Sequence, residues 1–280
     1  MTIAEFIYTV LLKPKPIKSA ANSVIRMILP QTVRHGPIEV VLNPKDPVVS
    51  GALMLHVYER SETVFVERSL RPGMTVVDVG ANVGLYSALS GHLVGSEGRV
   101  IAFEPDPECF HYLEETVKKN SLKNVKTVCL AASDHQGRSR LFTSTSNRGD
   151  SRLYDNELSD GSLEIETVIL DDYLPSVGIQ EMDFLKIDVQ GFEGHVFAGL
   201  KKTVLRSPRL VVMSEFWPDG LRRAGTDPEE LLGKLEQWGL SVHELLGDGT
   251  TQPIVNKSAF IEKWQGRQYT NIVCRKLKAT

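Results

Sequence analysis

The stretch Thr75–Gly84 reads TVVDVGANVG and decides the fold of the chain. It opens with apolar β-branched residues, which are typical of a short strand buried in a parallel sheet. Asp78 comes near the carboxyl end of that strand, and Gly80, Asn82 and Gly84 follow as residues suited to a tight turn. The residues after the turn have helical spacing. The stretch therefore predicts a strand, a glycine turn and a helix, the unit at which open α/β sheets bind nucleotide-like cofactors.

The glycine spacing distinguishes between classes of cofactor. A dinucleotide fingerprint has glycines at relative positions one, three and six. Counted from Gly80, the third position is Asn82 and the sixth is Leu85, so a nicotinamide-dependent oxidoreductase or epimerase is disfavoured. No Gly-Lys-Ser or Gly-Lys-Thr follows, which excludes a phosphate-binding P-loop. A tight turn with no ligand remains the alternative for this stretch taken alone.

The next strand adds an acidic residue at the expected place. Arg99–Phe103 is an apolar run that ends at Glu104, twenty residues beyond Gly84. A carboxylate at the tip of the neighbouring strand can accept hydrogen bonds from both ribose hydroxyls of a nucleoside. We therefore expect Glu104 to bind the ribose of the cofactor.

A third strand, Val125–Leu130, leads to two more candidate cofactor residues. Ser133 and Asp134 follow it, in a loop where an adenine would lie, and Asp134 would accept from the adenine amino group. The alternative is that Asp134 caps the turn toward Gly137.

A polar cluster is predicted at the strand that ends near Asp188. By the two-residue alternation of a strand, Lys186, Asp188 and Gln190 share one face, close to the cofactor turn. A lysine and an aspartate in a buried strand need each other or a ligand as partners. Glu215 ends the following strand, so its carboxylate is expected beside that of Asp188.

Composition bounds the classes of function. The chain has 280 residues, of which 41% are hydrophobic and 24% charged, as in an ordinary globular protein with a full core. Its net charge of −3 gives no basic footprint, which argues against a nucleic acid partner. Its three cysteines, Cys109, Cys129 and Cys274, are interpreted as buried thiols in a reducing compartment, so we expect a cytoplasmic protein.

Two segments stand apart from the alternating strands and helices. Residues 1–36 are interpreted as a helical appendage interrupted by prolines, in which a capping or dimerising helix is favoured over peripheral membrane contact. We expect residues 1–46, including a short strand at Ile38–Leu42, to form this appendage and residues 47–280 to form the main domain. The nineteen-residue polar loop Ser144–Ser162 is long for a compact domain and is expected near the site as a binding loop or lid.

These segments together resemble the FkbM-type methyltransferases, a family of class I S-adenosylmethionine-dependent enzymes. The resemblance rests on VDVGANVG at 77–84, FEP at 103–105, AASD at 131–134, LKIDVQGFE at 185–193, SE at 214–215 and TNI at 270–272. It implies a doubly wound, Rossmann-like, seven-stranded mixed α/β sheet with a terminal antiparallel strand. It also implies O-methylation of a hydroxyl on a sugar, polyketide or related small molecule. By this resemblance, the turn holds the amino-acid end of the cofactor, and Asp78 helps to hold its ammonium group.

The reaction requires a group that takes a proton from the acceptor hydroxyl. Asp188 and Glu215 are the first candidates, either as a base or as ligands of a divalent cation between them. His195 is a second candidate base, although a structural histidine on a helix is the alternative. Lys186 would hold Asp188 ionised or orient the acceptor. The family often has Glu where this chain has Gln190. A scaffold that keeps the cofactor fold without catalysis remains the other class of function.

Overall fold

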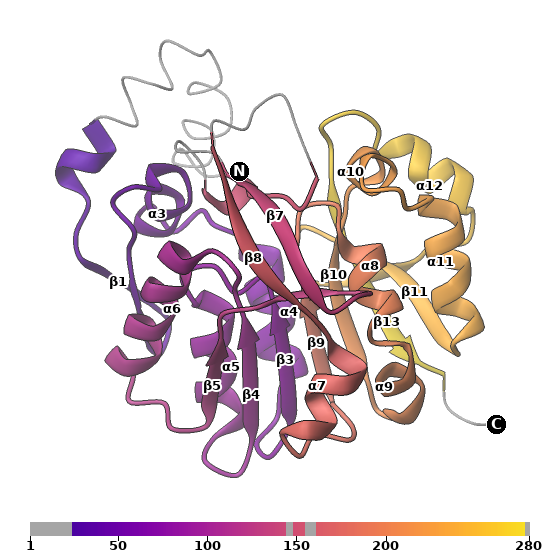
Figure 1. Cartoon of the computed structure of the whole chain (residues 1–280), viewed down its shortest axis with the longest axis horizontal. Helices are drawn as coiled ribbons and strands as arrows, with labels where there is room; N and C mark the ends of the chain where they lie inside the picture. Colours follow the sequence, from indigo (N-terminus) through magenta and orange to yellow (C-terminus); the bar gives the residue numbers. More distant parts are fainter. Residues whose placement is uncertain (1–23, 144–147, 155–160, 278–280) are drawn as a thin grey trace.

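The computed structural model describes residues 24–143, 148–154 and 161–277. In this part of the chain an eight-stranded mixed sheet forms the centre, with the order β12-β11-β13-β10-β9-β3-β4-β5 (Figure 1). The strand bounds are β3 Thr75–Val79, β4 Arg99–Phe103, β5 Val125–Val128, β9 Phe184–Ile187, β10 Val211–Phe216, β11 Leu240–Leu245, β12 Thr251–Pro253 and β13 Thr270–Lys276.

The pairing confirms the predicted sheet. Strands β5, β4, β3, β9 and β10 are parallel neighbours. Strand β13 runs antiparallel between β10 and β11, which is the predicted terminal antiparallel strand. The eighth strand is the three-residue β12, which pairs with the outer edge of β11. Its residues are half-buried or exposed and show no apolar alternation, so the sequence gives no signal for it.

Both faces of the sheet are buried, which explains the continuous apolar runs of its central strands. Val77 and Val79 of β3 belong to one core cluster, whereas Val76 of the same strand belongs to the cluster on the opposite face. The helices are α3 Pro47–Met54, α4 Arg60–Ser69, α5 Leu85–Val94, α6 Pro107–Lys119, α7 Leu170–Ser176, α8 Glu193–Ala198, α9 Lys201–Arg206, α10 Pro218–Arg223, α11 Pro228–Gln237 and α12 Lys257–Lys263.

A second, three-stranded sheet has the order β6-β8-β7, and its two long strands cross in front of the main sheet in the view of Figure 1. It consists of β6 Ala131–Ser133, β7 Gly137–Thr143 and β8 Gly161–Ile169. The backbone groups of Arg152 and Phe142 exchange hydrogen bonds of 2.8 and 2.9 Å, so the loop between β7 and β8 is fixed to β7 at this point. The short helix η2, Arg148–Asp150, precedes that contact.

The described part of the N-terminal segment is helical at residues 24–28, as expected, but continues as strands from Thr32. Residues 1–23 lie outside the described part, but β1 Thr32–His35 and β2 Ile38–Val41 form an antiparallel hairpin around the positive φ of Gly36. The backbone amides of Glu39 and Val41 donate to the side chains of Asn120, the C-cap of α6, and of Thr116 within α6, which attaches the hairpin to the main domain. The division at residue 46 stays a prediction. Among the described helices, none combines the length and the apolar character needed to cross a bilayer.

One expectation about the cysteines is wrong. Cys109 and Cys274 are buried, but Cys129 is exposed. Strand β5 ends at Val128, so Cys129 lies in the link to β6 rather than inside the sheet.

Candidate active site

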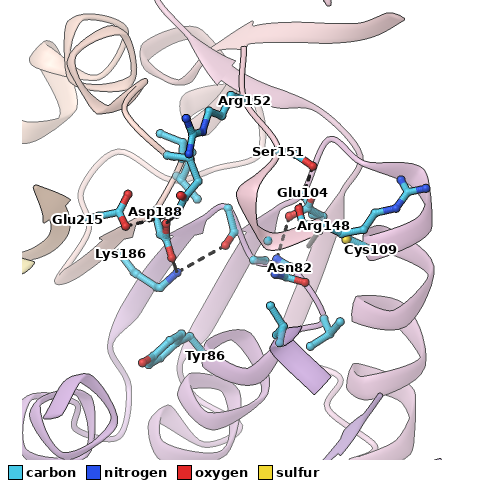
Figure 2. A pocket seen from close by; sticks show the side chains of 18 of the residues that line it. Asn82, Tyr86, Glu104, Cys109, Arg148, Ser151, Arg152, Lys186, Asp188 and Glu215 are labelled. Atoms are coloured by element: carbon cyan, nitrogen blue, oxygen red, sulfur yellow. Dashed lines mark hydrogen bonds and ion pairs between the residues drawn. The ribbon is translucent and has the colours of Figure 1, made fainter. Parts of the chain in front are cut away.

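A cavity of about 650 Å³ lies at the carboxyl ends of β3, β4, β9 and β10, where the sequence predicts the site. Figure 2 shows two groups of its side chains: Lys186, Asp188 and Glu215 together on one side, and Asn82 with Glu104 on the other. Residues 148, 149 and 151–153 also line it. The described part of the predicted polar loop is therefore part of the wall, as expected.

The turn after β3 has positive φ angles at Gly80, Asn82 and Gly84, and its two glycines pack closely against neighbouring segments. Gly80 has a φ of 80°, and a Cβ there would lie 1.9 Å from the carbonyl oxygen of Asp188. Asn82 has a φ of 50°. Gly84 has a φ of 89° and faces Leu113 of α6 instead of the cavity. Gly80 and Asn82 thus form the cavity wall, whereas Gly84 allows α5 to pack against α6.

Glu104 lines the cavity with its carboxylate held by the backbone. Its Oε2 accepts from the Asn82 amide at 2.8 Å, and its Oε1 accepts from the Asp106 amide at 2.9 Å. Burial raises the pKa of Glu104 to about 7, against the lowering effect of these two hydrogen bonds. Each carboxylate oxygen has a second lone pair, so two ligand hydroxyls can still donate to it.

Asp78 lies outside the described lining of the cavity, next to Lys186. Its Oδ2 accepts from the hydroxyl of Ser87 at 2.6 Å, and its Oδ1 lies 3.9 Å from the Lys186 ammonium. Burial raises the pKa of Asp78, and the charge of Lys186 opposes that shift. Its contact with a cofactor ammonium group stays a prediction.

Lys186 is the cation among the acidic groups of the site. Its ammonium lies 3.7 Å from Asp188 Oδ2 and 3.5 Å from the carbonyl oxygen of Gly80, and it stands 4.9 Å from the centre of the Tyr86 ring. Burial alone would lower the pKa of Lys186, but Asp188 and Asp78 raise it above its ordinary value. Lys186 therefore stays charged and compensates the carboxylates around it.

Asp188 and Glu215, which we call the carboxylate pair, are joined by one amide. Gln190 Nε2 donates to Asp188 Oδ1 at 2.8 Å and to Glu215 Oε1 at 3.3 Å. Gln190 has a φ of 55°, and its carbonyl oxygen accepts from the Tyr154 hydroxyl at 2.9 Å. The structure thus brings the predicted pair together and connects it to the loop.

Sequence reasoning missed Glu59 on the same wall. It precedes α4 with a φ of 39°, a conformation that is unusual for glutamate. Burial, and next the charge of Asp188, raise the pKa of Glu59 to about 8, whereas Lys186 lowers it. Its segment carries no motif, so no signal in the sequence pointed to it.

Besides Asp78 and Gly84, three more predicted site residues do not reach the described cavity wall: Ser133, Asp134 and His195. His195 Nδ1 lies 2.8 Å from Asp134 Oδ2, its Nε2 lies 2.8 Å from the Ala224 carbonyl oxygen, and its ring stacks on Phe192. Both ring nitrogens lie within hydrogen-bond distance of these oxygens, and the ring is not part of the described cavity wall. This geometry favours the structural alternative for His195, a link between the segment after β6 and α8, and its role as a base stays a prediction. Asp134 is engaged by His195 and His135, which leaves its adenine contact without support from the geometry.

The divalent-cation site expected between Asp188 and Glu215 would need further ligands. Among the described residues, no group of three histidine, cysteine, aspartate or glutamate side chains is placed to hold a metal ion.

The sequence of the chain also matches a known protein family. The family model described as "Methyltransferase FkbM domain" matches residues 78–242, more than half of the chain. The protein belongs to the FkbM methyltransferase family. The match begins at Asp78 and includes the glycine turn, Glu104 and the carboxylate pair. Membership decides against the nicotinamide-dependent alternative.

Three curated relatives are between 27% and 31% identical to the chain over the matched segments. The chain is 29% identical to the 2-O-methyltransferase NoeI of Sinorhizobium fredii over 49% of this chain and 61% of NoeI. It is 31% identical to the 31-O-demethyl-FK506 methyltransferase FkbM of Streptomyces tacrolimicus over 54% of this chain and 68% of that protein. It is 27% identical to the hexuronic acid methyltransferase AglP of Haloferax volcanii, over 59% and 62% of the two chains. The matched segments thus span about two thirds of these relatives.

Proposed function

We propose that this protein transfers a methyl group from S-adenosylmethionine to a hydroxyl of a small molecule, a sugar or polyketide. The observation that carries the proposal is the cavity in which a glycine turn and the Glu104 carboxylate face a pair of carboxylates. The names of three relatives support the O-methyl specificity and the acceptor class, because they describe methylation at a numbered oxygen or of a hexuronic acid.

The residues of the turn fit the cofactor. The side-chain oxygen of Asn82 is buried on the cavity wall and has no hydrogen-bond partner among the described residues. Glu104 retains acceptor capacity for two ribose hydroxyls, as argued above. Gly80 leaves backbone exposed to the cavity at the place where the amino-acid end of the cofactor would lie. When bound, S-adenosylmethionine supplies a methyl group activated on a sulfonium.

The carboxylate pair supplies the proton chemistry in this proposal. Asp188 or Glu215 would take the proton from the acceptor hydroxyl, and the bound cofactor would supply the methyl group to that oxygen. Lys186 and the Gln190 amide hold the pair in place, because they contact it at 3.7 Å or less. Much of the rate acceleration comes from orientation, because an in-line displacement needs the nucleophile, carbon and sulfur in one line.

Replacement of each carboxylate by its amide tests the assignment. Asp188→Asn and Glu215→Gln should bind S-adenosylhomocysteine like the wild type but lose at least about 100-fold in turnover, the range for a general base. His195→Gln is the matched control, because His195 lies off the cavity wall and should retain turnover. Calorimetry gives cofactor affinity, and transfer of a labelled methyl group gives turnover. Near wild-type turnover in both amide variants would refute the roles of the pair.

The same assay separates a catalyst from a silent scaffold. A scaffold would bind S-adenosylhomocysteine but transfer no methyl group to any hydroxylated acceptor. Labelled methyl groups recovered on a sugar or polyketide oxygen decide for the enzyme.

A further inference from the structure

Glu59 lies on the cavity wall in a backbone conformation that its own helix does not explain. It is the N-cap of α4, with a φ of 39° and a ψ of 54°, but its side chain caps no backbone amide of that helix. Its carbonyl oxygen accepts from the Thr63 amide at 3.0 Å and from the Thr63 hydroxyl at 2.9 Å, which fixes this conformation. Strained residues of this kind are concentrated at functional sites. The carboxylate of Glu59 therefore calls for a role in the cavity that it lines.

Two tyrosines lie close to this carboxylate. Tyr58 and Tyr86 also line the cavity, and the charge of Glu59 is, after burial, the largest cause that raises the pKa of each hydroxyl. Tyr86 is only 5% exposed, and its hydroxyl has no hydrogen-bond partner among the described residues. A buried hydroxyl without a partner is unfavourable. A ligand that hydrogen-bonds to Tyr86 beside Glu59 would remove this cost.

The carboxylates in this part of the cavity share one lysine. The charges of Asp188, Asp78, Glu59 and Glu215 all raise the pKa of Lys186. Lys186 makes its ion-pair contacts with Asp188 at 3.7 Å and with Asp78 at 3.9 Å, whereas no cation in the described part of the chain lies within 4.0 Å of the Glu59 carboxylate. Burial and the charge of Asp188 bring the pKa of Glu59 to about 8. A cation bound to Glu59 would lower that pKa and stabilise the carboxylate.

The neighbouring glycine turn indicates which cation this is. The Gly80 carbonyl oxygen lies 3.5 Å from the Lys186 ammonium, so the turn and the group of carboxylates meet at this lysine. Asp78, the residue expected from the sequence to hold the cofactor ammonium, is 1% exposed and lies off the described cavity wall, whereas Glu59 lies on it. An ammonium group binds well to a carboxylate and to aromatic side chains.

We propose that Glu59, together with the Tyr86 hydroxyl, binds the α-ammonium group of S-adenosylmethionine. This inference rests on the proposed function and deepens it, because it names a residue that recognises the methyl donor. The carboxylate neutralises the ammonium and fixes the amino-acid end of the donor beside the glycine turn. It also selects against adenosine derivatives that lack the amino group.

A ligand without the amino group tests the proposal. S-adenosyl-4-thiobutanoate is S-adenosylhomocysteine with hydrogen in place of that group, so the ratio of the two dissociation constants isolates the ammonium. In calorimetric titrations, the wild type should bind S-adenosylhomocysteine at least about tenfold more tightly than the analogue, the factor given by one charge-assisted hydrogen bond. Glu59→Gln should reduce this ratio by about tenfold, because the amide carries no charge. Tyr86→Phe should reduce it several-fold.

Glu62→Gln is the matched control. Glu62 belongs to the first turn of the same helix, but its carboxylate accepts from Ser61 and from Asn271 at 2.7 Å each and lies off the described cavity wall. The substitution removes the same charge and should keep the wild-type ratio. Melting curves verify that each variant is folded at the temperature of the titration, and Tyr86→Phe carries the test if Glu59→Gln does not fold.

A wild-type ratio near one, an unchanged ratio in the folded Glu59→Gln protein, or an equal loss in Glu62→Gln would each overturn the proposal. A loss in Asp78→Asn with none in Glu59→Gln would return the ammonium to Asp78 and overturn it as well. All of these results leave the proposed function in place, provided that the wild type binds S-adenosylhomocysteine. No binding of S-adenosylhomocysteine would refute both. A ratio that depends on Glu59, without methyl transfer to any acceptor, would support this inference and refute the proposed function.

Discussion

Replacement of Glu104 by Gln should weaken cofactor binding and remove its dependence on pH. The carboxylate is 8% exposed and already accepts one backbone amide at each oxygen. Two ribose hydroxyls would donate to its remaining lone pairs, and hydrogen bonds to a charged group contribute about 1.5–3 kcal/mol each. In Glu104→Gln the amide keeps one acceptor oxygen, so we expect a loss of about 2–3 kcal/mol, or about 30–150-fold in the dissociation constant of S-adenosylhomocysteine.

The pH dependence follows from the raised pKa of Glu104, which burial brings to about 7. Below that pH the free protein has a protonated Glu104, and binding through the carboxylate requires loss of the proton. The affinity of the wild type should therefore fall as the pH decreases from 8 to 6, by up to tenfold per unit below the pKa. The affinity of Glu104→Gln should have no such component, because its amide does not titrate.

Calorimetric titration with S-adenosylhomocysteine at several pH values measures both effects. Glu108→Gln is the matched control, because Glu108 also belongs to the segment after β4 but pairs with Lys45 and Arg148 and lies off the described cavity wall. Unchanged affinity in Glu104→Gln at pH 8 would refute the ribose role. An affinity that stays constant from pH 6 to 8 in the wild type would refute the raised pKa.

Three further substitutions test other parts of the site. Gly80→Ala would place a Cβ 1.9 Å from the Asp188 carbonyl oxygen, so unfolding in denaturant should show a loss of about 3 kcal/mol or more, and unchanged stability would contradict the packing. Glu59 has a folded pKa of about 8, above its ordinary value because of burial, so the wild type should lose stability as the pH rises from 5 to 8. Glu59→Gln should lose less stability than the wild type between pH 5 and 8. Melting temperatures that change with pH in the same way in both proteins would refute the raised pKa of Glu59. His195→Gln should melt lower, with a loss of about 1 kcal/mol, and a large fall in turnover would restore its role as a base.

Local patterns predicted that the glycine turn and Glu104 lie at one end of the sheet, because these residues follow one another along the chain. The glycine turn and Glu104 are separated by a single helix, and the βαβ geometry fixes how the tips of adjacent parallel strands meet. The alternation in β9 also predicted the contact of Lys186 with Asp188. Gln190 was placed on the right face although the strand ends at Ile187 and its backbone turns there.

The rest of the cavity wall was less predictable because distant segments without a motif form it. Glu59 precedes a helix, Arg152 belongs to a polar loop, and Trp217 follows β10, so no periodic pattern joins them. His195 shows the limit of a motif-based expectation. Its place after the specific motif suggested chemistry, but α8 turns its ring toward Asp134 and Ala224, away from the cavity. The separate three-stranded sheet was also missed as a unit, because strand pairing between distant residues leaves no local trace.

The contact of Gly80 with the backbone of Asp188 has a consequence for how such enzymes diversify. Because main chain meets main chain there, the spacing between the cofactor turn and the carboxylate that follows β9 is set by the sheet and not by side chains. Under the proposed function, the sheet itself therefore sets the distance between the bound methyl donor and the Asp188 carboxylate. New acceptors can then be acquired through changes in residues 148–154, in α10 and before β13, while the reacting atoms keep their alignment.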